Sequence, residues 1–182
     1  MNKLTDELEI AVLAGGCFWC TEAVFQRVRG VEEVISGYTG GHIKNPGYRE
    51  IITGRTGHAE AIMLKFNPQS ITFKEIIEIF LTTHDPTTLN RQGADVGTQY
   101  RSAIFYINDT QKEKALEVIA NFNTQPFYEN PIVTEVTKLD VFYNAEDFHQ
   151  DYYNQNTQQG YCQFVINPKL NKLRANFADK LK

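Results

Sequence analysis

The chain has 182 residues, a formal net charge of -4, 42% hydrophobic residues and 22% charged residues. This length suits one compact domain that buries roughly two-thirds of its unfolded surface, and the composition excludes the disordered, collagen-like and coiled-coil classes. Lysine and arginine are dispersed, so no basic stripe offers the surface that binding of nucleic-acid phosphates requires. The first seven residues are polar and no apolar run approaches the ~20 residues of a membrane span, so we expect a cytoplasmic protein without a membrane partner.

The first third of the chain alternates between strand and helix patterns. Residues 8–14 read as a short buried strand, which Gly15-Gly16 ends directly before the helical spacing of apolar residues over 18–28. A second strand is expected over 31–36. Residues 37–57 hold six of the twelve glycines, a density typical of a long functional loop.

Further alternation follows. Ala59–Phe66 is a plausible strand, and Thr72 with Glu75 has the spacing of a capping box ahead of an apolar helix. The later expected elements are an irregular stretch over 84–98, a strand over 100–107, an Asp109-capped helix to about residue 122, a strand near 132–141 and a short helix over 145–154.

The order of these elements predicts an α+β fold. We expect a two-layer sandwich in which helices pack on a mixed sheet with a ferredoxin-like core. Residues 154–160 are polar, uncharged and poor in packing residues, which indicates a mobile connector to Cys162. The prediction is one catalytic domain over residues 1–182, in which residues 154–182 form a long irregular C-terminal tail.

The three cysteines, Cys17, Cys20 and Cys162, point to thiol chemistry, because an odd number in a chain of this size argues against a disulfide scaffold. Cys17 falls at the turn from strand to helix, where unpaired N–H groups and the helix dipole favour the thiolate and predict a lowered pKa. The alternative is a buried cysteine that fills a contact between helix and strand. Phe18 and Trp19 could enclose a small apolar group of a substrate or belong to the core.

Seven sequence blocks resemble the peptide methionine sulfoxide reductase A family, in the family's order over about residues 10 to 165. These blocks are GCFW at 16–19, GYTGG at 37–41, NPGY at 45–48, GRTGHAE at 54–60, HDPT at 84–87, LNRQGADVGTQYRS at 89–102 and AEDFHQDYY at 145–153. The resemblance implies reduction of methionine S-sulfoxide, free or within proteins, to methionine. It also implies that Cys17 is the nucleophile and that Phe18 and Trp19 bind the methyl group of the sulfoxide.

The family pattern also assigns the groups that bind the sulfoxide oxygen. It implies that Glu60, Tyr48 and Tyr100 bind this oxygen, with Asp95 acting through water or through the network around Cys17. The chemistry fits, because a desolvated carboxylic acid can supply a proton near neutral pH and phenols can stabilise a developing oxyanion. Taken alone, Glu60 would be a solvent-facing strand residue, the tyrosines would be packing residues and Asp95 a turn residue.

Attack by Cys17 should leave a sulfenic acid, which condenses with a second thiol to form a disulfide. The family commonly places this resolving cysteine in the C-terminal segment, which favours Cys162; the alternative for Cys162 is a small apolar residue in a strand over 162–166. Cys20 is a possible alternative resolver, because Cys-x-x-Cys at a helix start is also a thioredoxin-like redox motif. His149 resembles a family histidine that orders the site or the tail.

Two other functions fit parts of the pattern. A general thiol-disulfide oxidoreductase would need Cys20 but not Glu60, and a non-enzymatic sensor of oxidised methionine would not need Cys17. The cysteines and histidines lack zinc spacing and no nucleotide fingerprint occurs, so neither a metal nor a cofactor is expected. Thioredoxin is the expected reductant, and the chain is expected to act as a monomer.

Overall fold

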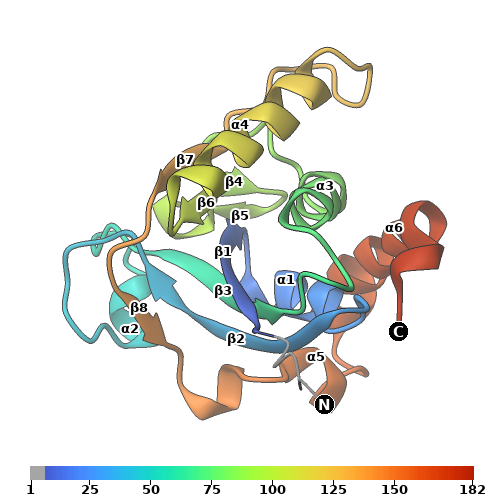
Figure 1. The fold of residues 1–182 in the computed structure, drawn as a ribbon. Helices are drawn as coiled ribbons and strands as arrows, with labels where there is room; N and C mark the ends of the chain where they lie inside the picture. Colours follow the sequence, from blue (N-terminus) through green and yellow to red (C-terminus); the bar gives the residue numbers. More distant parts are fainter. Residues whose placement is uncertain (1–6) are drawn as a thin grey trace, which may run out of the picture.

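The computed structural model describes residues 7–182 (Figure 1). Six strands form one sheet in the order β7 (Glu135–Lys138), β6 (Ser102–Tyr106), β1 (Glu9–Gly15), β3 (Ala59–Phe66), β2 (Val31–Thr39) and β8 (Phe142–Asn144). Neighbouring strands are antiparallel except β6 and β7, which are parallel. The mixed α+β class predicted from the sequence is therefore confirmed.

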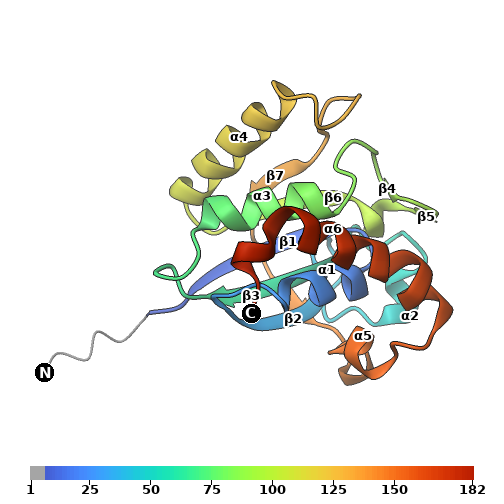
Figure 2. The same ribbon diagram turned by 90° about the vertical axis from the view of Figure 1, so that its right-hand side faces the viewer.

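Helices cover one face of this sheet. The helices are α1 (Phe18–Phe25), α2 (Tyr48–Ile51), α3 (Phe73–Thr83), α4 (Asp109–Asn123), α5 (Tyr152–Gln155) and α6 (Asn167–Phe177). Figure 2 shows α1, α3 and α6 in front of the sheet, with α4 above them. A small hairpin of β4 (Arg91–Gln92) and β5 (Asp95–Val96) lies outside the main sheet.

Period-two alternation divides the strand residues between the two faces of the sheet. Leu13 and Ile62 belong to the main core beneath the helices, whereas the second, smaller core on the other face is rich in alanine. Leu139, from the segment that joins β7 to β8, and Phe142, the first residue of β8, pack against this smaller core. Glu60 has the same parity as Ile62 in β3, so the alternation directs its side chain toward the helix-covered face.

Several predicted elements match the structure closely. The strands β1, β3 and β6, the helix α1 and the capping box at Thr72 all occur where the sequence placed them. Asn108 rather than Asp109 caps α4, because the Asn108 side chain accepts the Gln111 N–H. The expectation about the N-terminal residues rests mainly on residues 1–6, which lie outside the described residues.

The expected irregular C-terminal tail is wrong. A π-helical turn (Cys162–Ile166) leads directly into α6, and neither the tail nor residues 162–166 forms a strand. Ile166, Leu170 and Leu173 are buried at helical spacing, so this helix packs its apolar face on the core. The polar connector over residues 154–160 suggests an irregular tail in the sequence, although a helix with a buried apolar face follows it.

The single helix expected over residues 145–154 is also wrong. A 3-10 turn (Asp147–His149) and the short helix α5 replace it, separated by Asp151 in the left-handed region at φ 55°. A non-glycine residue with this backbone conformation is uncommon and interrupts a helix. The Asp151 and Tyr152 N–H groups donate hydrogen bonds to the Glu22 side chain, which stabilises this conformation.

Candidate active site

Cys17 lies at the turn between β1 and α1, as the sequence predicted. Gly16 has φ +94°, and a Cβ atom on it would lie 2.6 Å from the Gln92 side chain, so the hairpin strand β4 packs directly on this glycine. Cys17 is the N-cap residue of α1, and its side chain makes no capping hydrogen bond. Only 9% of Cys17 is exposed, so a small substrate must enter a narrow opening to reach it.

A cavity of about 140 Å³ opens onto Cys17. The residues that line it come from α1, α2, β3, β5, the 3-10 turn (Thr98–Tyr100) and the C-terminal segment; they are Cys17, Phe18, Trp19, Tyr48, Glu60, Asp95, Tyr100 and Tyr161. Seven of these eight are the residues that the sequence pattern singled out. The structure therefore brings together side chains that are far apart in the sequence, such as Cys17 and Tyr100, which are 83 positions apart.

Glu60 is the acidic group of this cavity. It is 2% exposed, and its Oε1 accepts the backbone N–H of Phe18 at 3.2 Å. Burial, with smaller effects of the neighbouring Asp95 and Cys20, raises the pKa of Glu60 to about 8 against the opposing effect of the Phe18 N–H. Near pH 7 the Glu60 carboxyl group is mostly protonated and can donate a proton into the cavity.

The two thiols of α1 interact. Burial raises the pKa of Cys17 well above its ordinary value, and Cys20 and Glu60 add to this effect, while the Trp19 N–H lowers it. A hydrogen bond from the Cys17 thiol lowers the pKa of Cys20 to about 7, against the opposing effect of burial. The lowered Cys17 pKa expected from the helix start is therefore wrong, because desolvation and the adjacent anion outweigh the N–H groups.

The tyrosines of the cavity are neutral hydrogen-bond donors. Burial, followed by the charge of Glu60, raises the pKa of both Tyr48 and Tyr100. Tyr161 donates its hydroxyl to Asp95 Oδ2 at 3.1 Å and lies 3.6 Å from the sulfur of Cys20. Sequence reasoning missed Tyr161, although its place directly before Cys162 was a signal that could have found it.

Trp19 forms an aromatic wall together with the segment that follows β8. The Trp19 and Tyr152 rings stack at 3.7 Å with an interplanar angle of 6°, and the Tyr161 ring meets Trp19 edge-on at 5.8 Å. The indole N–H donates to His149 Nδ1 at 3.2 Å, and burial lowers the pKa of His149 so that the ring stays neutral. His149 thus contacts Trp19 beside the pocket, and its role in ordering the site stays a prediction.

Glu22 attaches this wall to α1. Its buried carboxylate accepts the N–H groups of Asp151 at 3.0 Å and of Tyr152 at 3.2 Å, as well as the Ser36 hydroxyl at 3.2 Å. These bonds hold the left-handed turn at Asp151 and orient Tyr152 onto Trp19. A carboxylate suits this position because both of its oxygens are acceptors.

Glu22→Gln is expected to loosen the aromatic wall. The amide has nearly the same shape, but its NH₂ group must face a backbone N–H or the Ser36 hydroxyl, and an unsatisfied buried donor costs about 1–3 kcal/mol. We expect a shift in the fluorescence of Trp19, the only tryptophan, and a KM raised about three- to tenfold with a smaller change in kcat. Gln26→Ala is the matched control, because the Gln26 side chain hydrogen-bonds to the side chains of Asp151 and Asn154 in the same segment. Equal effects of both variants would contradict this role for Glu22.

The π-helical turn that begins at Cys162 packs against α1, but Cys162 does not line the cavity. It is fully buried at the start of the π-helical turn, and burial followed by the charge of Cys20 raises its pKa. All three cysteines are free thiols. Cys162 begins a π-helical turn, a type of turn that is frequent at functional sites.

Comparison with known proteins identifies the family. The family model for peptide methionine sulfoxide reductase matches residues 9–181. Relatives named peptide methionine sulfoxide reductase MsrA from Deinococcus radiodurans and Chromobacterium violaceum are 53% and 51% identical over 174 residues. These alignments cover 96% of this chain, with 84% and 99% of the relatives' own lengths.

Solved structures agree with this result. Reduced Mxr1 from Saccharomyces cerevisiae matches with a TM-score of 0.79 at 32% identity, covering 87% of this chain and 91% of that one. Methionine sulfoxide reductase A of Corynebacterium diphtheriae matches with a TM-score of 0.79 at 33% identity, covering 87% and 80%. Mxr1 in complex with Trx2 matches in fold, with a TM-score of 0.56 at 24% identity over 84% of this chain and 89% of that one.

The chain therefore belongs to the peptide methionine sulfoxide reductase family. Its relatives define it further as an oxidoreductase of the MsrA type, an enzyme that reduces methionine sulfoxide. Among residues 7–182, no group of three or more histidine, cysteine, aspartate or glutamate residues is arranged to hold a metal ion. No helix in the same range is long and apolar enough to cross a membrane.

Proposed function

We propose that the enzyme reduces the S epimer of methionine sulfoxide, free or within polypeptides, through a sulfenic acid on Cys17. The Cys17 sulfur attacks the sulfoxide sulfur, the oxygen is transferred to Cys17 and methionine leaves. A second thiol then displaces that oxygen as water and forms a disulfide. Each turnover thus converts one sulfoxide and two thiols into one thioether, one disulfide and one water molecule.

The observation that carries this proposal is the buried carboxyl group of Glu60 in the same small cavity as Cys17. A sulfoxide oxygen gains negative charge as the thiol attacks, and Glu60 supplies the proton that neutralises it. Tyr48 and Tyr100 donate hydrogen bonds to the same oxygen, which is preorganised stabilisation of developing charge. Asp95 holds Tyr161 in place at the edge of the cavity.

The remaining groups of the pocket bind the methyl group and activate the thiol. Phe18 and Trp19 enclose the methyl group of the sulfoxide, since both line the cavity and both are largely apolar. Cys20, which has the lower pKa of the two thiols, accepts the proton of the neighbouring Cys17. Near neutral pH the thiolate therefore resides on Cys20, and Cys17 gives up its proton as it attacks the sulfoxide sulfur.

The resolving thiol is Cys162, with Cys20 as the second candidate. Cys162 supports the assignment because it is fully buried, lies close to Cys20 and starts a π-helical turn that can unwind. The neighbouring Cys17 thiol lowers the pKa of Cys20 to about 7, which supports Cys20 as the second candidate. Resolution by Cys162 moves the disulfide into the C-terminal segment, where a protein reductant can reach it after the turn unwinds.

Thioredoxin is the proposed reductant, and the cytoplasm is the proposed compartment. The related yeast protein Mxr1 has been captured in a complex with Trx2. A catalytic disulfide must be reduced after each turnover, and the cytoplasm maintains thiols in the reduced state. We propose that the chain acts as a single catalytic unit, in which the C-terminal segment supplies the resolver.

The stereochemistry is tested by following both epimers of methionine sulfoxide in one reaction with dithiothreitol as reductant. We expect the S epimer to be consumed and the R epimer to remain, which chiral chromatography measures directly. One enzyme per sulfoxide epimer is the general rule for this chemistry. Consumption of R as fast as S would contradict the proposed geometry, and consumption of neither would contradict the proposed function.

A further inference from the structure

The most exposed large hydrophobic side chains of the described residues lie in segments that build the cavity. Exposed fractions are 80% for Phe164, 74% for Leu89 and 66% for both Val96 and Phe148, more than for any other large hydrophobic side chain in residues 7–182. Single exposed apolar residues are ordinary, but a group gathered around a site marks an interaction surface. We name these four residues the apolar rim.

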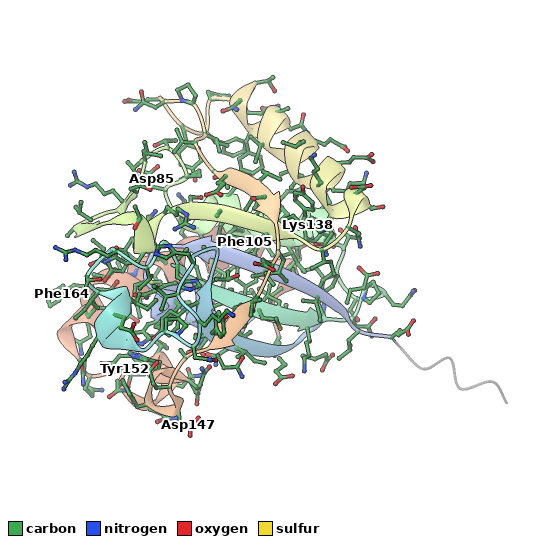
Figure 3. The ribbon with its side chains drawn as sticks, turned by 90° about the vertical axis from the view of Figure 1, so that its left-hand side faces the viewer. Asp85, Phe105, Lys138, Asp147, Tyr152 and Phe164 are labelled. Atoms are coloured by element: carbon green, nitrogen blue, oxygen red, sulfur yellow. The ribbon has the colours of Figure 1, made fainter. Side chains whose placement is uncertain are left out.

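Two rim residues are fixed to one side of the cavity. Val96 directly follows Asp95, and Phe164 lies about one helical turn beyond Tyr161. The hydrogen bond between Tyr161 and Asp95 at 3.1 Å joins the two segments. Figure 2 shows the hairpin of β4 and β5 and the turn that leads into α6 along its right-hand edge. Figure 3 shows Phe164 at the corresponding edge, which is the left-hand edge of that view.

Similar contacts connect the other two rim residues, Phe148 and Leu89, to the wall of the cavity. The Phe148 and His149 rings lie 4.2 Å apart, and the His149 ring lies 4.7 Å from that of Tyr48, which lines the cavity. Leu89 directly precedes Asn90, and the Asn90 carbonyl group accepts the Gly97 N–H at 2.9 Å. Gly97 is the N-cap residue of the 3-10 turn that ends at Tyr100, a residue of the cavity wall. Each rim residue is therefore one or two short contacts away from a residue of the cavity wall.

We infer that the apolar rim binds polypeptide on either side of a methionine sulfoxide and favours apolar neighbours. A cavity of about 140 Å³ holds one side chain, so the adjoining residues of a bound polypeptide must lie outside it, over the rim. Methionine commonly lies among apolar residues in cores and interfaces, and its oxidation disrupts that packing. This inference rests on the proposed function and adds a preference among its substrates.

The test compares three substrates with dithiothreitol as the reductant, so that no protein reductant is required. These are free methionine S-sulfoxide and two pentapeptides that flank it with leucine and phenylalanine or with serine. In the double variant Val96→Ser/Phe164→Ser, we expect kcat/KM for the apolar peptide to fall about tenfold, while free amino acid and serine peptide change less than about twofold. Leu116→Ser on α4, which replaces an exposed apolar residue outside the rim, is the matched control.

The outcomes separate this inference from the proposed function. An unchanged preference for the apolar peptide in the double variant would overturn the inference, while turnover of the free amino acid would still support the proposed function. A loss seen only when thioredoxin replaces dithiothreitol would assign the rim to the reductant and also overturn it. Failure of the unsubstituted enzyme on all three substrates would contradict the proposed function itself.

Discussion

Cys17→Ser is expected to abolish reduction of methionine sulfoxide, with turnover more than about 10⁴-fold lower than that of the unsubstituted enzyme. Serine differs from cysteine by one atom and fits the same N-cap position, so the fold should persist. A hydroxyl group in this buried site is neither ionised nor able to carry the oxygen as a sulfenic acid. Methionine release measured with dithiothreitol as the reductant reports this loss.

Cys162→Ser provides the contrast. The variant keeps the nucleophile and the cavity, so one equivalent of methionine should still be released in a single turnover, but no disulfide should follow. If Cys17→Ser reduced sulfoxide at a rate near that of the unsubstituted enzyme, the proposed chemistry would be wrong. Such a result would favour a role in which Cys17 only packs between β1 and α1.

Glu60→Gln is expected to lower kcat by about 10²- to 10⁴-fold, the usual contribution of a general acid. The amide oxygen can still accept the Phe18 N–H, so the geometry of the pocket should be kept. What the amide cannot do is donate a proton to the sulfoxide oxygen. KM should change much less than kcat, because the proton matters chiefly in the transition state.

The dependence of activity on pH provides a second measurement for Glu60. Its pKa is raised to about 8, and the protonated form is the active one, so kcat should fall as the pH rises through about 8. The pKa of Cys20 is about 7, so thiolate formation should make activity rise as the pH increases through about 7. Loss of the alkaline limb in Glu60→Gln is expected; an unchanged alkaline limb would assign it to another group.

Much of the site could be predicted from the sequence because the chemistry depends on residues next to strong local signals. The glycine pair before Cys17 predicts the turn between strand and helix, and Gly16 indeed has a positive φ. Glu60, by contrast, is an ordinary strand position by periodicity alone. Only the family resemblance distinguished it, since whether a strand residue faces a cavity depends on packing partners far away in the chain.

The errors in the sequence predictions have physical causes that act over long distances. The pKa of Cys17 depends on burial and on Cys20, which outweigh the local effect of the helix start. The helical C-terminal segment is stabilised by burial of residues such as Leu170 against the core. The finer expectation of a two-layer, ferredoxin-like core remains a prediction, which the antiparallel order β6-β1-β3-β2 favours.

The most direct test of the central claim is a single turnover without added reductant. Reduced enzyme would be mixed with one equivalent of methionine S-sulfoxide, followed by quantification of methionine and mapping of disulfides by peptide mass spectrometry. We predict one equivalent of methionine and a link between Cys17 and Cys162. A link between Cys17 and Cys20 would contradict the assignment of the resolver, and the absence of both methionine and a disulfide would contradict the proposed chemistry as a whole.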